Sequence, residues 1–397
     1  MKMTDKEQGT IKGNRIYFLD NLRTFMIFLV VLYHAGLVYA SSGVGAYINW
    51  LVVDPSTNDI PDLVNLIVDI FIIATLFFIA GYFTPLSLKT RKDWIFFKDR
   101  FKRLMIPWVI AVLIIIPLYK VIFLYSRNLP QENWTTYFHF NQLTSQNWLW
   151  FLPVLFLFSI LYLLFSRVNI FTFNITLKRA VFAVFLIGFV YSFCMDIFNG
   201  MGWTLTVLID FQNERLLIYF MIFLLGSLCY KLNIFESKQT NKKLYYLVIF
   251  TAWIPIILYS YFLIIYLIYP GHFIFSRIID SLLMWFSFNL SLLCLLYVMI
   301  NTFRYYLNKQ GRIGKELNKN SYYVYIIHVI VLGVIALTML NMTIPSLLKY
   351  LVLTVSTFVT SNLIISLARA LWKSRNYSDH STTVKEMKGS PSKASFG

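Results

Sequence analysis

Charged side chains are scarce in this sequence. Only 13% of its 397 residues are Asp, Glu, Lys or Arg, whereas 58% are hydrophobic, and the mean hydropathy is +0.65. Soluble domains carry about 25% charged residues. The composition therefore excludes an ordinary soluble enzyme and predicts a polytopic membrane protein. The number of soluble domains can then not be estimated from the length of the chain.

Cysteine is scarce as well, and several catalytic motifs are missing. The three cysteines, Cys194, Cys229 and Cys294, all fall in apolar segments without paired spacing, which indicates neither a disulfide framework nor a zinc site. The sequence has no glycine-rich phosphate loop, no Gly-x-Ser-x-Gly elbow and no cluster of metal ligands. We therefore expect no metal cofactor.

Acidic residues are outnumbered by basic ones. The chain has 35 Lys and Arg against 18 Asp and Glu, which gives a formal net charge of +17. Such a charge can indicate a nucleic-acid partner, but here the cations lie in the loops between apolar runs. Basic loops on the cytoplasmic side of a membrane explain them better, so we expect no nucleic-acid partner.

Long apolar runs are what the sequence has in abundance. A bilayer core needs about 20 apolar residues for each helix that crosses it. The sequence therefore predicts an all-α polytopic membrane protein with about ten transmembrane helices. The ten stretches lie near residues 17–40, 63–83, 105–125, 147–166, 179–199, 215–232, 244–269, 278–301, 321–340 and 346–371.

The basic residues alternate between the connections and set the orientation. The connection between the second and third spans is rich in Lys and Arg, whereas residues 41–62 hold three Asp and no cation. The positive-inside rule then places both termini in the cytoplasm. We expect residues 1–373 to form the membrane domain, and residues 374–397 to be a polar, disordered cytoplasmic tail.

The first span carries two ionisable groups, Arg23 and His34. They are eleven residues apart, so on a helix they share one face and lie about 16 Å apart along the axis. An ionisable group inside a bilayer is costly, which makes both residues functional candidates. The alternative is that Arg23 reaches the cytoplasmic surface and His34 bonds a neighbouring helix.

Two more ionisable residues lie inside predicted spans. Asp69 lies as far inside the outer end of the second span as His34 lies inside that of the first, so the two share a depth. We predict that Asp69 orients His34 and stabilises its cation, the alternative being that Asp69 faces water in an outward-open cavity. His328, near the middle of the ninth span, is a candidate contact for a polar substrate.

Residues 89–104 are amphipathic and predict a helix on the cytoplasmic face. The apolar residues that recur at helical spacing are Trp94, Phe97, Phe101 and Leu104. Arg100 and Arg103 are three residues apart and project together. Two close guanidinium groups suit phosphate recognition, the alternative being that they anchor the segment to lipid head groups.

Several motifs together resemble a known family. The opening Tyr17-Phe-Leu-Asp20-x-x-Arg23-x10-His34 resembles membrane-bound acyltransferase family 3, and looks most like its glucan biosynthesis protein C branch. The departures are Ala80, where a serine is common, and Trp148, where that branch often has a histidine. The motifs that agree are Phe77-Phe78-Ile-Ala-Gly81-Tyr-Phe, Arg100-x-x-Arg103-x-x-x-Pro107, Leu149-Trp150-Phe151-Leu152 and the Tyr-rich run into His328.

The resemblance implies an O-acyltransferase in a bacterial cytoplasmic membrane. It would move an acyl group, acetyl or succinyl, from cytoplasmic acyl-CoA to a hydroxyl of an extracytoplasmic glycan or glycolipid. His34 would act as general base or carry a transient acyl group, and Arg23 would hold the donor or steady developing negative charge. Arg100 and Arg103 would bind the phosphates of the coenzyme A donor.

Two other classes fit ten spans with buried ionisable residues. One is a transporter or flippase for a glycan intermediate, and the other is a structural scaffold or sensor. The charged groups concentrate on one helix and one cytoplasmic loop, without paired broken helices, which favours the enzyme. Acyl-CoA cleavage separates the classes, because a pure carrier shows none.

Overall fold

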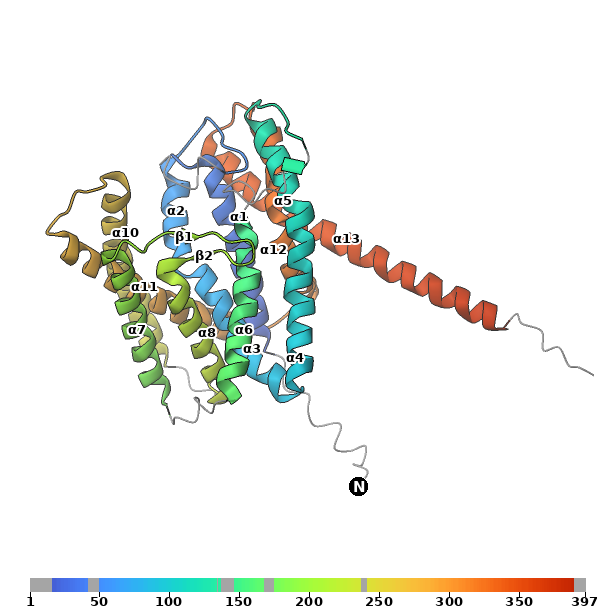
Figure 1. Cartoon of the computed structure of the whole chain (residues 1–397), viewed down its shortest axis with the longest axis horizontal. Helices are drawn as coiled ribbons and strands as arrows, with labels where there is room; N and C mark the ends of the chain where they lie inside the picture. Colours follow the sequence, from blue (N-terminus) through green and yellow to red (C-terminus); the bar gives the residue numbers. More distant parts are fainter. Residues whose placement is uncertain are drawn as a thin grey trace, which may run out of the picture.

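The computed structural model describes residues 16–41, 50–133, 135–136, 146–167, 175–236 and 241–388, with side chains up to residue 374. Among these residues, ten helical segments are long and apolar enough to cross a membrane. They stand side by side as one bundle (Figure 1). The predicted all-α polytopic class is confirmed.

The helices and strands follow the predicted spans closely. Five spans are made of more than one element, and a short β-hairpin joins two of the ten spans. In chain order the elements are α1 (Tyr17–Tyr39), α2 (Asp59–Asp69), α3 (Ile72–Lys89), α4 (Asp93–Arg100), the π-helical η2 (Phe101–Met105), α5 (Ile106–Ser126), η4 (Asn147–Trp150), α6 (Phe151–Arg167), α7 (Leu177–Ile197), β1 (Trp203–Thr204), β2 (Phe211–Gln212), η6 (Asn213–Arg215), α8 (Leu216–Lys231), α9 (Lys242–Thr251), α10 (Trp253–Ile268), α11 (Arg277–Tyr306), α12 (Arg312–Met339) and α13 (Ser346–Lys388).

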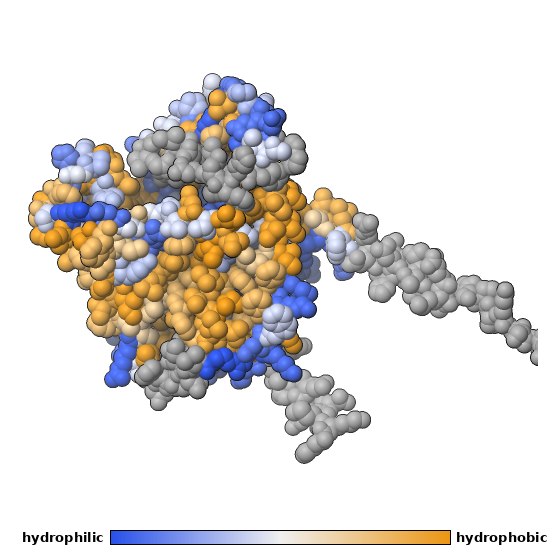
Figure 2. All heavy atoms as spheres, in the orientation of Figure 1, coloured by the Kyte–Doolittle hydropathy of each residue, from blue (hydrophilic) through white to orange (hydrophobic). Residues whose placement is uncertain are grey.

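The outer surface of the bundle is apolar. Large hydrophobic side chains such as Ile254, Leu367 and Leu113 are 70%, 62% and 52% exposed. On the face shown in Figure 2, hydrophobic residues form a band between two more hydrophilic ends. Soluble proteins rarely expose apolar surface on this scale, so the band fits the hydrocarbon of a bilayer and the chain is a multi-pass membrane protein.

Helix α1 lies at the centre of the packing and contacts α2, α3, α11, α12 and α13. Small residues let other helices approach closely. A Cβ atom on Gly81 of α3 would lie 1.9 Å from the carbonyl oxygen of Phe223, and one on Gly226 of α8 would lie 2.1 Å from that of Phe78. The two backbones therefore touch, as small residues at membrane helix interfaces allow.

The β-hairpin fixes the start of η4, the turn that carries Trp148. Its strands pair antiparallel, and Asp210 in its loop accepts the backbone N–H groups of Gln146 (3.1 Å) and Thr206 (2.8 Å). Burial raises the pKa of the Asp210 carboxyl, while these two N–H groups lower it. A buried carboxylate with backbone donors thus holds the turn in place.

The last helix continues beyond the predicted membrane domain. α13 runs to Lys388 and projects away from the bundle (Figure 1), so the first part of the predicted tail is helical in the structure. No glycine or proline interrupts residues 346–388, which accounts for the continuity. Residues 389–397 lie outside the described residues, and the cytoplasmic location and disorder of the tail stay predictions.

A buried ion pair ties α13 to the connection between α1 and α2. Lys349 Nζ lies 2.8 Å from Asp54 Oδ2, and the two side chains are only 2% and 1% exposed. The backbone N–H of Asp54 donates to the carbonyl of Val38 at 2.9 Å, so the pair also holds this connection against α1. Removing one partner would leave a buried charge uncompensated.

We expect Lys349→Met to lower the free energy of unfolding by about 3 kcal/mol, because Asp54 would then be buried without its cation. The control is Lys319→Met, whose pair with Glu316 is exposed and contributes at most about 1 kcal/mol. Thermal unfolding in detergent measures both. The double variant Asp54→Leu/Lys349→Met should recover most of the loss, and a double variant as unstable as the single one would contradict this account.

Candidate active site

Two predicted site residues meet between α1 and α12. His34 Nδ1 lies 2.8 Å from His328 Nε2, and the two rings stack with centroids 5.0 Å apart. His328 is fully buried, whereas His34 is half-buried and keeps some accessible surface. This contact matches the alternative interpretation of His34, in which its side chain bonds a neighbouring helix. Part of the His34 ring nevertheless stays within reach of a substrate.

The hydrogen bonds around His328 fix which nitrogens carry protons. His328 Nδ1 lies 2.7 Å from the carbonyl oxygen of Tyr325 and 3.2 Å from that of Val324. A carbonyl can only accept, so Nδ1 of His328 carries the proton and Nε2 of the neutral ring carries a lone pair. That lone pair accepts the Nδ1–H of His34, which leaves the Nε2 lone pair of His34 free to act as a base.

Aromatic rings enclose the histidine pair. Trp50 stacks on His34 with centroids 5.0 Å apart and planes at 17°, and Trp148 meets His328 edge-on at 6.3 Å. Tyr119 contacts both tryptophans, at 6.1 and 5.9 Å. Sequence reasoning missed Trp50 and Tyr119, because one lies in a connection and the other among many aromatic residues of a span.

Trp148, which the sequence marks as a departure from the family pattern, supports the helix that carries His328. Its Nε1–H donates to the carbonyl of Ile326 at 3.2 Å, and the hydroxyl of Tyr325 donates to the carbonyl of Trp148. Both α12 residues lie within one turn of His328. The bulky residue at this position therefore fixes the backbone that sets the His328 tautomer.

Asp69 has a different partner from the predicted one. Its Oδ2 lies 2.6 Å from Nη1 of the buried Arg215, which also reaches the backbone carbonyl of Asp69 at 3.4 Å. Helix α2 ends at Asp69 and α3 starts at Ile72, so the second span is broken between them. Arg215 therefore donates to a backbone carbonyl at this break. This corrects the predicted contact between Asp69 and His34. A shared depth does not make two helix faces neighbours, and the role of Asp69 in turnover stays a prediction.

Arg23 lies three turns from His34 on α1, towards the end of the bundle where the chain enters. Its Nη2 donates to the carbonyl of Asn318 at 3.3 Å and lies 3.4 Å from Asp20 Oδ1. The side chain is 38% exposed. Arg23 is thus held between α1 and α12, the same two helices that carry the histidine pair, with surface left for a ligand.

Arg100 and Arg103 lie on one continuous helical stretch, α4 and η2, which includes most of the predicted amphipathic segment. Arg100 is partly buried, and its Nη2 donates to Thr84 Oγ1 of α3 at 3.3 Å. Arg103 is exposed, and its backbone carbonyl accepts the hydroxyl of Tyr322 of α12 at 2.6 Å. The basic segment therefore docks on α12 two turns from His328, at the same end of the bundle as the N-terminus (Figure 1).

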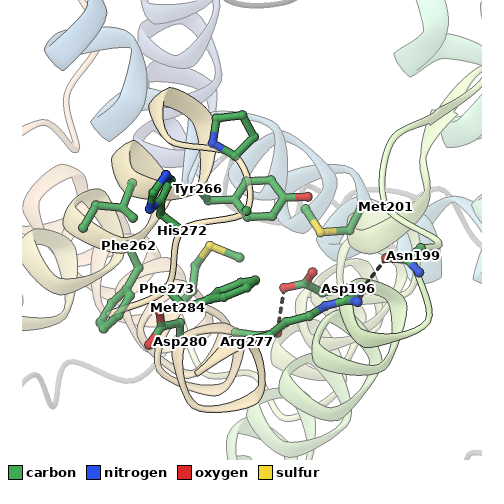
Figure 3. Close-up of a pocket in the computed structure, with 14 residues that line it drawn as sticks. Asp196, Asn199, Met201, Phe262, Tyr266, His272, Phe273, Arg277, Asp280 and Met284 are labelled. Carbon is green, nitrogen blue, oxygen red and sulfur yellow. Dashed lines mark hydrogen bonds between the residues drawn. The ribbon is translucent and has the colours of Figure 1, made fainter. Parts of the chain in front are cut away.

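A cavity of about 390 Å³ lies elsewhere, among the ends of α7, α10 and α11 (Figure 3). Aromatic rings and polar groups share its lining, and His34 and His328 are not part of it. Six of the residues around it are Asp196, Asn199, Tyr266, His272, Phe273 and Arg277. No group of three or more His, Cys, Asp or Glu that could hold a metal ion occurs within the described part of the chain.

The charged groups of this cavity are fixed by protein partners. Asp196 Oδ2 accepts the hydroxyl of Ser281 at 2.6 Å and the indole N–H of Trp285 at 2.9 Å. Arg277 Nη2 donates to Asn199 Oδ1 at 2.5 Å, and Figure 3 shows this bond at the rim. Polar residues that line the cavity are therefore held by hydrogen bonds within the protein.

We expect Asp69→Asn to lower the free energy of unfolding by about 2 kcal/mol, because it removes the carboxylate from the buried Arg215 guanidinium. The pH dependence of turnover should stay the same, because His34 bonds His328 and not Asp69. Thermal unfolding and a pH–rate profile measure the two effects. A shifted pH–rate profile with unchanged stability would contradict this geometry and favour the Asp69–His34 pair instead.

Comparison with known protein families identifies the family of the chain. Residues 16–365 match the acyltransferase domain of acyltransferase family 3, which covers the chain from the start of α1 into α13. Neither the curated proteins nor the solved structures give a match. Because the matched region covers most of the chain, including nine whole spans, part of the tenth and the histidine pair, the chain belongs to acyltransferase family 3.

Proposed function

We propose that this protein is an integral-membrane O-acyltransferase. It moves an acyl group, acetyl or succinyl, from acyl-CoA on the cytoplasmic side to a hydroxyl of an extracytoplasmic glycan or glycolipid. The observation that carries the proposal is the half-buried His34, whose Nε2 lone pair is left free by its bond to His328. Within an acyltransferase family, a base of this kind suits the removal of a hydroxyl proton.

The reaction then runs through His34 Nε2. This nitrogen takes the proton of the acceptor hydroxyl as the hydroxyl oxygen attacks the thioester carbonyl carbon. The carbon–sulfur bond breaks, the thiolate of coenzyme A takes the proton back from His34, and an ester is left on the acceptor. The Nδ1–H bond to His328 holds the ring in register and stabilises the imidazolium. We assign His328 to this orienting role in place of the predicted substrate contact.

The donor side of the proposal uses the basic end of the bundle. The positive-inside rule places this end in the cytoplasm. Arg100 and Arg103 would bind the phosphates of coenzyme A, and Arg23 would steady the donor on its way inward. Since Arg23 and His34 lie about 16 Å apart along α1, an extended pantetheine arm is long enough to bring the thioester to the base.

The acceptor side uses the opposite end. The cavity among α7, α10 and α11 lies at the end of the bundle that this orientation places outside the cell. Tyr266 and Phe273 offer flat apolar faces, and Asn199 and Arg277 offer polar groups that can bond hydroxyls. This combination suits a sugar ring, which has apolar faces and a hydroxyl rim. The cavity therefore supports a hydroxyl-rich acceptor rather than a purely apolar one.

The direct test is release of free coenzyme A by the detergent-purified protein offered acetyl-CoA or succinyl-CoA. We expect His34→Ala to lower the release at least about 100-fold, because a positioned general base contributes that much. The variant should still fold and should bind coenzyme A as the wild type does, which shows that the donor site is intact, while its thermal midpoint should fall slightly because the buried His328 Nε2 loses its partner. A wild-type protein that neither releases nor binds coenzyme A would contradict the proposal and turn attention to a transporter.

The proposed binding of coenzyme A by Arg100 and Arg103 has its own test. We expect the double variant Arg100→Ala/Arg103→Ala to weaken coenzyme A binding at least about 100-fold, because charge-assisted hydrogen bonds contribute roughly 1.5–3 kcal/mol each and two guanidinium groups are removed. The matched control is Lys98→Ala/Lys102→Ala, which removes the same charge from exposed positions of the same segment. Equal affinity in the arginine variant and the wild type would assign the arginines to lipid head groups.

A further inference from the structure

The indole N–H of Trp50 has no partner among the residues that the structure describes. The side chain is only 4% exposed, and Nε1 is buried without a hydrogen bond in the described part of the chain. A buried donor left unsatisfied costs about 1–3 kcal/mol, and a phenylalanine would fill the same place without this cost. A group kept at such a cost calls for an explanation, and one explanation is an acceptor atom that arrives with a ligand.

Trp50 is also fixed beside the base. Its ring lies nearly parallel to His34, with planes at 17° and centroids 5.0 Å apart. Its backbone carbonyl accepts Nη2–H of Arg127 at 2.8 Å, and Nη1 of the same guanidinium reaches the carbonyl of Leu51 at 3.3 Å. The edge of Tyr119 meets its ring at 6.1 Å. The indole is therefore held on both its backbone and its ring, as a preorganised donor must be.

The other donors around the histidine pair are in use. Trp148 Nε1–H donates to the carbonyl of Ile326, and the hydroxyl of Tyr325 donates to the carbonyl of Trp148. The N–H of His34 lies on His328. Among these rings, the N–H of Trp50 is the one left for an incoming atom.

The proposed transfer needs such a donor. When the acceptor oxygen attacks the thioester, the carbonyl π electrons move onto the carbonyl oxygen and give it a negative charge. A fixed N–H aimed at that oxygen lowers the barrier, and it is worth most where water is excluded. We infer that Trp50 is a catalytic residue whose Nε1–H donates to the thioester carbonyl oxygen as this charge develops. The N–H keeps its proton, and no bond to Trp50 forms or breaks. This inference rests on the proposed function.

The test is Trp50→Phe, which keeps an aromatic ring on His34 and removes the N–H. With acetyl-CoA as the probe and free coenzyme A as the readout, we expect kcat to fall about 100-fold, as for the loss of an oxyanion donor. KM for acetyl-CoA and the affinity for coenzyme A should stay the same. The thermal midpoint should stay the same or rise, because the variant removes an unsatisfied buried group.

Two other tryptophans serve as matched controls. Trp108 also has a buried Nε1 without a partner in the described residues, but it lies on α5, and the rings that contact the histidine pair in the described part of the chain do not include it. Trp108→Phe should therefore leave kcat unchanged. Trp148→Phe removes an N–H that donates to Ile326, so it should lower the thermal midpoint.

Each outcome decides the matter. An active wild type with unchanged kcat in Trp50→Phe would overturn the donor role and leave the proposed function standing. Loss of kcat together with loss of thermal stability would assign Trp50 to packing and would also overturn it. An equal loss of kcat in Trp108→Phe would show that the effect is not specific to the histidine site. A wild type that releases no coenzyme A from acetyl-CoA would remove the proposed function, and this inference with it.

Discussion

The hydrogen bond between His34 and His328 is the interaction on which the rest of the site depends. In an apolar bundle, every buried donor needs an acceptor, and the carbonyls of α12 supply the first one by holding the Nδ1–H of His328. The tautomer of His328 then fixes the tautomer of His34, which leaves a free lone pair on Nε2 of the half-buried His34 ring. Trp148 supports this series of hydrogen bonds, because it fixes the backbone of α12 next to His328. A neutral base is thus kept ready without a buried carboxylate beside it.

Two other buried cations of the membrane domain are paired with carboxylates. Arg215 donates to both the carboxylate and the backbone carbonyl of Asp69 where the second span breaks. Lys349 pairs with Asp54 where α13 meets the connection after α1. Such pairs avoid the cost of an isolated charge in the bilayer. Against this background, the N–H of Trp50, which has no partner among the described residues, stands out because it lies beside the half-buried histidine of the pair.

The positions of the ten spans could be predicted from the sequence, because about 20 apolar residues per crossing is a local property. His34 and His328 could each be singled out as costly groups, but their contact depends on how two distant helices pack. The prediction for Asp69 failed for the same reason: depth in the bilayer can be counted along a helix, whereas the neighbouring face cannot. The break after Asp69 gave no signal, since neither glycine nor proline stands at residues 69–72. No signal in the sequence marked Trp50 either, because this residue lies in a connection and is positioned by a hydrogen bond from the distant Arg127.

The central claim is that His328 holds His34 as a neutral imidazole with its proton on Nδ1. The most direct measurement is the ¹⁵N spectrum of histidine-labelled protein in lipid nanodiscs at neutral pH. The chain has five histidines, so the signals of His34 are identified by their loss in His34→Ala. We expect a protonated Nδ1 and an unprotonated Nε2 on His34, and a mixture of tautomers in His328→Ala. A proton on His34 Nε2 in the wild type, or a spectrum of His34 that His328→Ala leaves unchanged, would contradict the account.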